Sequence, residues 1–262
     1  MTKQSTQCWM CGAAANSSEH RIKKADLVRS YGTGPYHGPS APVHVRDGAV
    51  TPIQGPRAKK LKYSPSLCEQ CNNARTQTHD RAYDHFVSWV LANEEPVLYR
   101  RFVDFAEVYG SDFEDPQRDL FKYFVKSFGC RLVDAGEPAP EDLVALLPLK
   151  SFRTALKITF CVNEDILLLP EPTRSVFVGK GELTTWVLRS NPPAPKGYIW
   201  DEHVSWLTVR YWYDREPDGS LGSTWIANTQ FLYLGSFEPL SSEQRAELLE
   251  KVRNDPDTKN DS

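Results

Sequence analysis

Long hydrophobic runs are missing from this sequence of 262 residues. No segment has the roughly 18 consecutive apolar residues that a membrane-spanning helix needs, and no charged start followed by an apolar core marks a secretory signal. Cysteine is scarce, with six residues in all, and four of them form two close pairs. We therefore expect thiols kept for metal rather than for disulfides, a reducing cytoplasm, and no contact with membrane.

Strong net charge is also missing, since the formal charge is −3, but the charge is unevenly distributed. Residues 1–80 carry 11 Lys and Arg against 5 Asp and Glu, whereas the rest of the chain carries 20 against 29. A basic end on an acidic protein favours a polyanionic partner, DNA first, with RNA not excluded. The residues expected to contact backbone phosphates are Arg21, Lys23, Lys24, Lys59, Lys60, Lys62 and Arg75.

Two Cys-x-x-Cys pairs, Cys8/Cys11 and Cys68/Cys71, are each followed by residues that favour turns. Four thiolates in two such knuckles predict a closed, tetrahedral, structural zinc site. Two alternatives stay open, namely two buried thiol pairs and a thioredoxin-like redox pair. The redox alternative has less support, because neither pair lies at a strand-to-helix junction of a βαβ unit.

Polar residues that suit phosphodiester chemistry adjoin both knuckles. Glu19 and His20 follow the first pair, and Asn72 follows the second. Over about the first 90 residues the pattern resembles the zinc-containing HNH endonucleases of the ββα-metal superfamily. The resemblance implies that His20 is the general base, that Glu19 and Asn72 hold a catalytic Mg²⁺ or Mn²⁺, and that zinc is structural. A neutral imidazole would remove a proton from water, and the divalent ion would act as a Lewis acid.

Several features depart from that family or have a simpler explanation. The family's middle Asn is missing, because Lys62-Tyr-Ser-Pro65 occupies its place. Successive strand residues point to opposite faces, so Glu19 and His20 need a strand end or bulge to face one groove. Asn72 is equally suited to cap a helix. His79, two helical turns after Asn72, is a candidate phosphate contact or second ligand, or a packing residue.

The remaining chain is expected to have a helical part and then a β-rich part. Helices are predicted from near 73 to 90, over Pro96–Tyr109, over Pro116–Phe128 with Gly129 as C-cap, over Glu141–Leu147 and over Ser241–Val252. Strands are predicted over Leu156–Val162, Ser175–Val178, Leu183–Leu188, Trp206–Tyr213 and Thr224–Leu234, with a turn at Pro217-Asp-Gly219. Five of the seven tryptophans lie in this part, and core packing is the simplest role for them.

These patterns predict an α+β fold. It comprises an HNH-like zinc domain of the ββα-metal type (1–92), a helical connector (93–150), a mostly antiparallel β domain with a terminal helix (151–252) and a disordered tail (253–262). The expected function is metal-dependent DNA cleavage, with a C-terminal domain for regulation, partner binding or dimerisation, and a bacterial defence role by analogy of architecture alone. One alternative is an inactive zinc-knuckle adaptor that binds nucleic acid or protein; another is that the main activity belongs to the C-terminal half.

Overall fold

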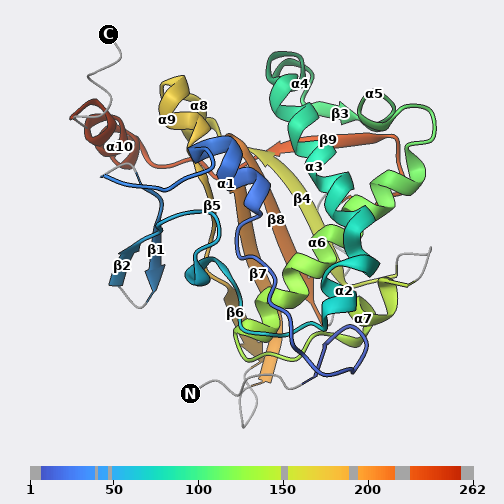
Figure 1. Cartoon of the computed structure of the whole chain (residues 1–262). Helices are drawn as coiled ribbons and strands as arrows, with labels where there is room; N and C mark the ends of the chain where they lie inside the picture. The colour runs from blue at the N-terminus through green and yellow to red at the C-terminus, as the bar shows by residue number, and fades with distance from the viewer. Residues whose placement is uncertain are drawn as a thin grey trace.

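The computed structural model describes residues 7–38, 41–46, 49–148, 153–188, 194–215 and 225–254. The fold is mixed α+β, as the sequence predicts, with a mostly antiparallel sheet in the C-terminal half and a terminal helix (Figure 1). The four paired cysteines form one cluster near the N-terminus.

The main sheet has seven strands in the order β3-β9-β4-β8-β7-β5, and β6 pairs with β7. All neighbours are antiparallel except β4 and β9, which run parallel. The strands are β3 (Phe102–Asp104), β4 (Leu156–Val162), β5 (Val178–Lys180), β6 (Thr184–Leu188), β7 (Ala194–Val204), β8 (Leu207–Asp214) and β9 (Phe231–Ser236).

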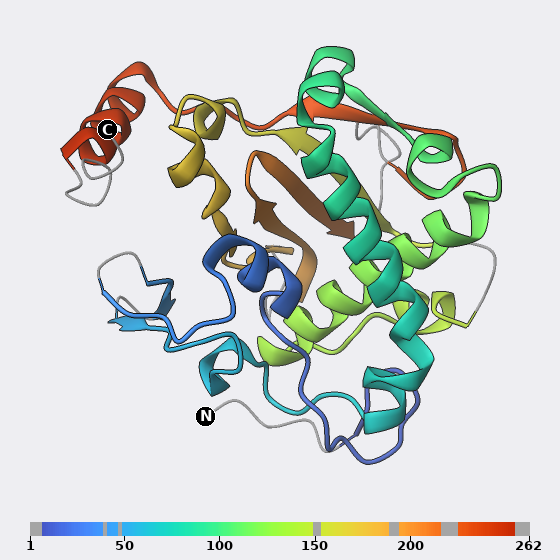
Figure 2. The ribbon, with the colours of Figure 1, turned by 45° about the horizontal axis from the view of Figure 1, so that its top comes forward.

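Three helices, α1, α3 and α6, lie on one face of this sheet (Figure 2). The α-helices of the chain are α1 (Lys24–Tyr31), α2 (Glu69–Asn72), α3 (Gln77–Ala92), α4 (Glu94–Arg100), α5 (Phe105–Tyr109), α6 (Glu114–Asp134), α7 (Glu141–Leu146), α8 (Glu164–Leu167), α9 (Glu171–Ser175) and α10 (Ser242–Asn254). The described residues also contain two short 3₁₀ helices, η1 (Lys59–Leu61) and η2 (Ala74–Thr76).

The largest hydrophobic core lies between α3, α6 and the sheet, and it is rich in aromatic rings. Phe124 of α6 meets Phe160 of β4 edge to face at 5.5 Å, and Phe128 stacks on Tyr211 of β8 at 5.6 Å between ring centroids. Such pairs add to the free energy gained by burying apolar area. Residues on both sides of positions 92 and 150 contribute to this one core.

The tryptophans of the β-rich part mostly serve as core residues. Trp200, Trp206 and Trp225 are buried, whereas Trp186 and Trp212 are partly exposed and pack together at 5.0 Å between ring centroids. The prediction of core packing therefore holds for three of the five.

The Gly/Pro-rich segment between the knuckles contains ordered structure that its composition did not predict. It forms α1 and a two-stranded hairpin of β1 (Val43–Arg46) and β2 (Ala49–Pro52). Leu27, Tyr36, Ile53 and Leu61 make a separate small core within it. The segment is therefore held by a local apolar cluster as well as by the cysteines.

The single helix predicted over Pro96–Tyr109 is wrong. The chain forms α4, the edge strand β3 and then α5. Arg101 adopts the left-handed conformation, with φ at 59°, and this ends α4. Asp104 then caps α5 by accepting a hydrogen bond from Ala106 N at 2.9 Å. Pairing with β9 therefore outweighs the helical pattern over residues 102–104.

The predicted end of the third helix at Gly129 is also wrong, because α6 continues to Asp134. Gly129 lies in the middle of the helix, where its missing side chain leaves room for the ring of Trp9 from the first knuckle. A glycine within a helical pattern has here a packing role instead of a capping role.

Strand β7 was not predicted, although it is the longest of the sheet. Its sequence has Pro195 near its start and later contains Asp201-Glu202-His203, a composition unusual for a central strand. Glu202 is nevertheless 3 % exposed and pairs with Lys180 of β5 at 2.7 Å. Ser127 of α6 donates a hydrogen bond to Glu202 at 2.6 Å and accepts one from Lys180 at 2.8 Å. This internal ion pair allows the charged residue to be buried.

Other boundaries differ by a few residues. The strand predicted over Ser175–Val178 is the end of α9 followed by β5, and β9 begins at Phe231. The predicted turn at 217–219 and most of the predicted tail, residues 255–262, lie outside the described residues. Helix α10 has a capping box at its start: Gln244 N donates to Ser241 Oγ, and Ser241 N donates to Gln244 Oε1.

Candidate metal centre and the neighbouring charged site

Cys8, Cys11, Cys68 and Cys71 place their sulfur atoms within 4.8 Å of one another. Cys11 Sγ and Cys68 Sγ are 3.7 Å apart. Sulfurs at about 2.3 Å from a tetrahedral zinc ion are separated by about 3.8 Å, so the cluster has the dimensions of a Cys₄ zinc site. The predicted grouping of these four residues is confirmed, and its donor set fits zinc.

Both knuckles have local hydrogen bonds that shape them for a metal. Gly12, with φ at +75°, turns the chain back so that its N–H donates to Cys8 O at 2.8 Å. In the second knuckle Cys68 caps α2, because its sulfur accepts a hydrogen bond from Cys71 N at 3.4 Å. This bond lowers the pKa of the Cys68 thiol to about 7, which favours the thiolate that binds metal.

A short irregular ladder joins the first knuckle region to the second. Ser17 pairs with Leu67 and His20 pairs with Lys62 in two isolated antiparallel bridges. The bridges are three positions apart from Ser17 to His20 but five positions apart from Lys62 to Leu67, so the segment 62–67 is bulged. Helices α2 and α3 follow the ladder directly. The extra residues of this bulge lie between Lys62 and Leu67, on the side opposite Glu19 and His20.

Asn72 connects the end of α2 to this ladder. Its Nδ2 donates to Ser17 Oγ at 2.9 Å and to Ser18 O at 3.3 Å, next to Glu19 in the chain. Its Oδ1 is buried and accepts no hydrogen bond from any described residue. Asn72 is the last residue of α2, and Thr76 precedes α3, so the alternative of a helix N-cap does not apply.

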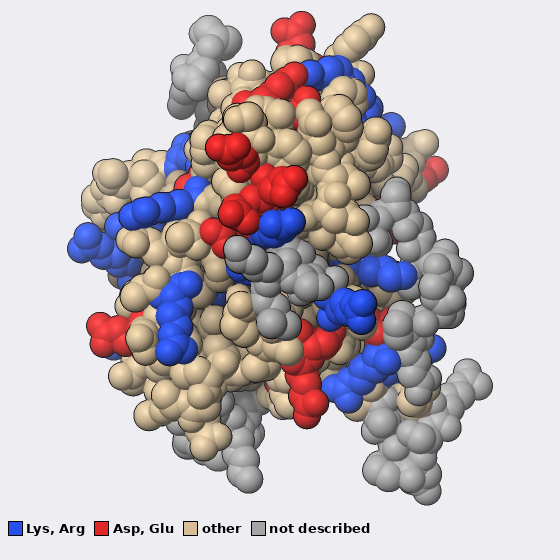
Figure 3. All heavy atoms as spheres, turned by 90° about the vertical axis from the view of Figure 1, so that its right-hand side faces the viewer, with Lys and Arg blue, Asp and Glu red and all other residues tan. Residues whose placement is uncertain are grey.

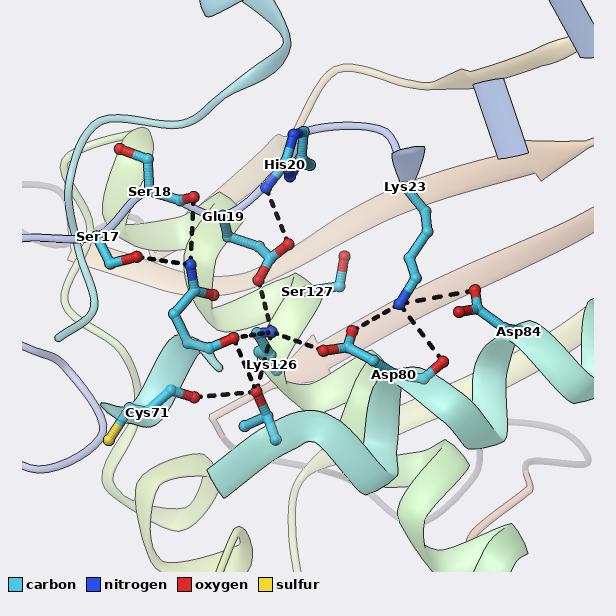
Figure 4. Close-up of polar contacts among 12 residues, drawn as sticks. Ser17, Ser18, Glu19, His20, Lys23, Cys71, Asp80, Asp84, Lys126 and Ser127 are labelled. Atoms are coloured by element: carbon cyan, nitrogen blue, oxygen red, sulfur yellow. Dashed lines mark hydrogen bonds and ion pairs between the residues drawn. The ribbon is translucent and has the colours of Figure 1, made fainter. Parts of the chain in front are cut away.

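A lysine from α6, Lys126, occupies the space beside Glu19 (Figure 4). Its side chain is 2 % exposed, and its Nζ lies 2.5 Å from Glu19 Oε2 and 3.5 Å from Asp80 Oδ2. It also donates to Thr76 Oγ1 at 3.1 Å and to Asn72 O at 3.4 Å. Burial lowers the pKa of this ammonium, but the two carboxylates raise it more, so the net shift is upward. Lys126 is therefore a permanent cation.

The expected divalent ion does not fit this arrangement. Glu19 Oε2 is held by Lys126, and Glu19 Oε1 accepts the N–H of His20 at 2.9 Å. An ion bound to the same carboxylate would lie close to a buried ammonium and be repelled by it. Glu19 Oε2 and the main-chain oxygen of Asn72 both contact Lys126, so the cation between these two residues belongs to the protein.

His20 is half-buried at the ladder. Burial lowers the pKa of its imidazole, Glu19 opposes this shift, and Lys62 and Lys24 add to it. The ring is therefore neutral at pH 7, which is the form that a general base needs. His79, by contrast, is 5 % exposed on α3 and lies 3.6 Å from Asp119 of α6. Its structural environment is that of a packing residue.

The predicted phosphate-binding residues fall into two groups. Arg21 pairs with Asp134 at 2.7 Å, and Lys23 pairs with Asp80 at 2.7 Å. Arg75 is exposed and donates to Cys71 Sγ at 3.6 Å. The others are exposed and form no ion pair with another described residue. Together with Arg57 they constitute what we call the basic surface: Lys24, Arg57, Lys59, Lys60 and Lys62.

The basic surface adjoins His20, because Lys24 and Lys62 are close enough to influence its pKa. Lys24 and Arg57 also line a pocket of about 650 Å³ between α1 and the segment before η1. On the face that carries α5 and α7, by contrast, acidic and basic side chains are interspersed (Figure 3).

Sequence reasoning missed Lys126, Asp80 and Thr76. The signal was present: Lys126 interrupts the apolar run Phe124-Val125 and Phe128 in a segment with helical periodicity. A charged residue there has to find partners inside the fold. Those partners come from two other segments, which the pattern of α6 alone does not reveal.

Comparison with known proteins found no matching family model, no similar curated protein and no similar solved structure. Among the described residues, no helix combines the length and apolar character needed to cross a membrane.

Proposed function

We propose that the protein binds nucleic acid, DNA foremost, through its basic surface. The observation that supports this proposal is the contrast between the two groups of cations. Arg21 and Lys23 are neutralised by carboxylates inside the protein, whereas the five residues of the basic surface are exposed and have no described ion-pair partner. Exposed unpaired cations are free to exchange their counterions for phosphates.

The role of the Cys₄ centre in this proposal is structural. The second knuckle follows the segment that contains Lys62, and the first precedes the segment that contains His20, and these two residues form a β-bridge. A metal that joins the two knuckles ties both segments together, and so it fixes Lys62 relative to His20. Phosphate contacts of this type position a duplex without reading its sequence.

The test compares two quadruple variants with the same change in net charge. Lys24→Gln, Lys59→Gln, Lys60→Gln and Lys62→Gln together remove four cations of the basic surface. Binding of a fluorescent DNA duplex, measured by anisotropy at several salt concentrations, should lose roughly three units of slope in log affinity against log salt.

The matched control removes four cations that form ion pairs elsewhere, through Arg100→Gln, Arg118→Gln, Lys122→Gln and Lys251→Gln. For this control variant, the slope of log affinity against log salt should stay near that of the wild-type protein. Equal slopes for the two quadruple variants would show that the basic surface does not bind DNA.

We further propose, as a second candidate, that the protein hydrolyses the bound strand as an HNH-type endonuclease with His20 as general base. The observation in its favour is the neutral, half-buried imidazole beside Lys24 and Lys62. His20 would take a proton from water as the water oxygen bonds to phosphorus and the bond to the 3′ oxygen breaks. Lysine ammonium groups beside it would neutralise the phosphate, and the departing oxygen would take a proton from solvent.

Cleavage of labelled DNA should be measured with Mg²⁺, with Mn²⁺ and without added divalent ion. His20→Ala should lose at least about 100-fold in rate while its zinc content and DNA affinity stay unchanged. His85→Ala, an exposed histidine on α3, is the control. If the wild-type protein binds DNA but cuts no nucleic acid under any of these conditions, the alternative of a nucleic-acid-binding adaptor is correct.

A further inference from the structure

The oxygen atoms around Lys126 form a small cage. It consists of Glu19 Oε2, Asp80 Oδ2, Thr76 Oγ1 and the main-chain oxygen of Asn72, at 2.5, 3.5, 3.1 and 3.4 Å from Nζ. Two carboxylates, a hydroxyl and a carbonyl are hard oxygen donors, the type that Mg²⁺ and Mn²⁺ prefer. Here they surround an ammonium group that is almost fully buried.

Three of the four oxygens of the cage lie too far from Nζ to coordinate a bare divalent ion placed there. Oxygen ligands approach Mg²⁺ at about 2.1 Å and Ca²⁺ at about 2.3–2.6 Å, whereas hydrogen bonds to a lysine are about 2.7–3.2 Å long. Three of the four oxygens lie at 3.1 Å or beyond. They would have to approach by about 1 Å to hold a bare divalent ion in the position of Nζ.

Two ammonium groups offset most of the carboxylate charge of the site. Glu19 and Asp80 bring two negative charges, Lys126 brings one positive charge, and Lys23 brings a second through its 2.7 Å contact with Asp80. Lys23 also contacts a third carboxylate, Asp84, at 3.7 Å. A divalent ion added to this cluster would therefore meet two ammonium groups that repel it.

We propose that Lys126 is the resident cation of this cage, and that loss of its ammonium converts the cage into a binding site for a hard divalent cation such as Mn²⁺. Without Lys126, Glu19 and the half-neutralised Asp80 remain beside a space the size of the lost side chain. Water enters that space and completes the shell of an ion held by two carboxylates. This proposal is independent of nucleic-acid binding and of His20.

The test uses zinc-loaded protein and Mn²⁺ as the probe. Free Mn²⁺ is measured by electron paramagnetic resonance during a titration, and thermal unfolding is followed in parallel. Mn²⁺ binds thiolates more weakly than zinc does, so it leaves the Cys₄ centre occupied. The wild-type protein should show no saturable binding that depends on Glu19. Lys126→Ala should bind one Mn²⁺ at least about tenfold more tightly, and Mn²⁺ should raise its Tm.

Two variants control for charge and location. Lys122→Ala removes the same charge one turn earlier on α6, where Lys122 contacts Asp119, and it should behave like wild type. The double variant Glu19→Gln/Lys126→Ala should lose the binding that Lys126→Ala gains. If Lys126→Ala does not fold, Lys126→Ser, which is equally short and leaves the space open to water, takes its place.

Two results would overturn the proposal. In the first, wild-type protein binds Mn²⁺ as tightly as the Lys126 variants and loses this binding through Glu19→Gln; Lys126 then yields its place to a metal. In the second, the folded Lys126 variants bind no Mn²⁺, so the cage is not a cation site. Neither result depends on whether the protein binds or cuts nucleic acid.

Discussion

The indole ring of Trp9 lies directly over Gly129, and it joins the first Cys-x-x-Cys knuckle to the interior of helix α6. A Cβ atom placed on Gly129 would lie 2.6 Å from two carbon atoms of the indole, Cη2 and Cζ2. Real Cβ atoms are not found at that distance from an aromatic ring, so the contact requires glycine. The Cys₄ module is thereby packed on the same helix that carries Lys126.

Gly129→Ala should destabilise the protein by about 1–3 kcal/mol, because the added methyl group overpacks the contact with Trp9. In a Trp9→Ala background the same change should instead stabilise by about 0.5–1 kcal/mol, since alanine is the better helix residue. Urea unfolding of the four proteins gives both values. Gly55→Ala, at a position with open space around it, is the control. A destabilisation that persists without Trp9 would show that the ring is not its cause.

Cys68→Ser should abolish zinc binding, since a Cys₄ site loses one of its four ligands. The lost ligand is the thiol whose pKa is lowered to about 7, which favours the metal-binding thiolate. Metal analysis should give one zinc per wild-type chain and far less in the variant. Cys161→Ser is the matched control, because Cys161 is a buried thiol on β4, outside the four-cysteine cluster. Equal zinc content in the two variants would refute the Cys₄ assignment.

Lys180→Met should destabilise the protein by about 3–5 kcal/mol, because it leaves the carboxylate of Glu202 buried without a counter-charge. Adding Glu202→Gln should recover much of this loss, since the amide can still accept a hydrogen bond from Ser127. Chemical unfolding of the two single variants and the double variant measures the coupling. Additive losses in the double variant would mean that the 2.7 Å contact contributes no specific stability.

Acid should weaken the fold through His79. Burial lowers the pKa of His79 from 6.5 to about 4, against the attraction of Asp119. Between these values the unfolded chain binds a proton that the folded chain does not. Stability is therefore complete above about pH 6.5 and falls as the pH drops toward 4.

The effect of His79 is isolated by comparing wild type with His79→Gln. On lowering the pH from 7 to 5, the wild-type protein should lose about 2 kcal/mol more than the variant does. Any effect of acid on the Cys₄ centre is common to both proteins and cancels in the difference. Parallel curves of stability against pH would contradict the assigned pKa of His79.

Local patterns predicted those parts of the fold that depend on neighbours in the sequence. The β4 strand was predicted with its observed bounds, Leu156–Val162, because alternating β-branched and aromatic residues define it. The cysteine cluster followed from two short motifs. Each of these features is encoded within a few residues.

The errors arose where a distant segment decides the local structure. Residues 102–104 pair with β9, Gly129 accommodates Trp9, and Glu202 in β7 is neutralised by Lys180. The site around Lys126 shows the same limit of prediction from local sequence. Glu19, His20 and Asn72 could be named from their motif, whereas Lys126 enters the site from α6 and changes which cation it holds.

The pairing of β3 with β9 has a consequence for synthesis on the ribosome. Asp104, which caps α5, accepts two hydrogen bonds from Gln230, which lies 126 residues later in the chain. The stretch from α4 to α5 therefore leaves the ribosome long before the strand that completes it, and its edge stays unpaired throughout that interval. At the roughly 5–20 residues per second of translation, this open edge persists for about 6–25 seconds in each new chain. Chaperone binding and premature aggregation compete for the chain in that interval. A chain that is truncated before β9 keeps the edge of β3 unpaired permanently.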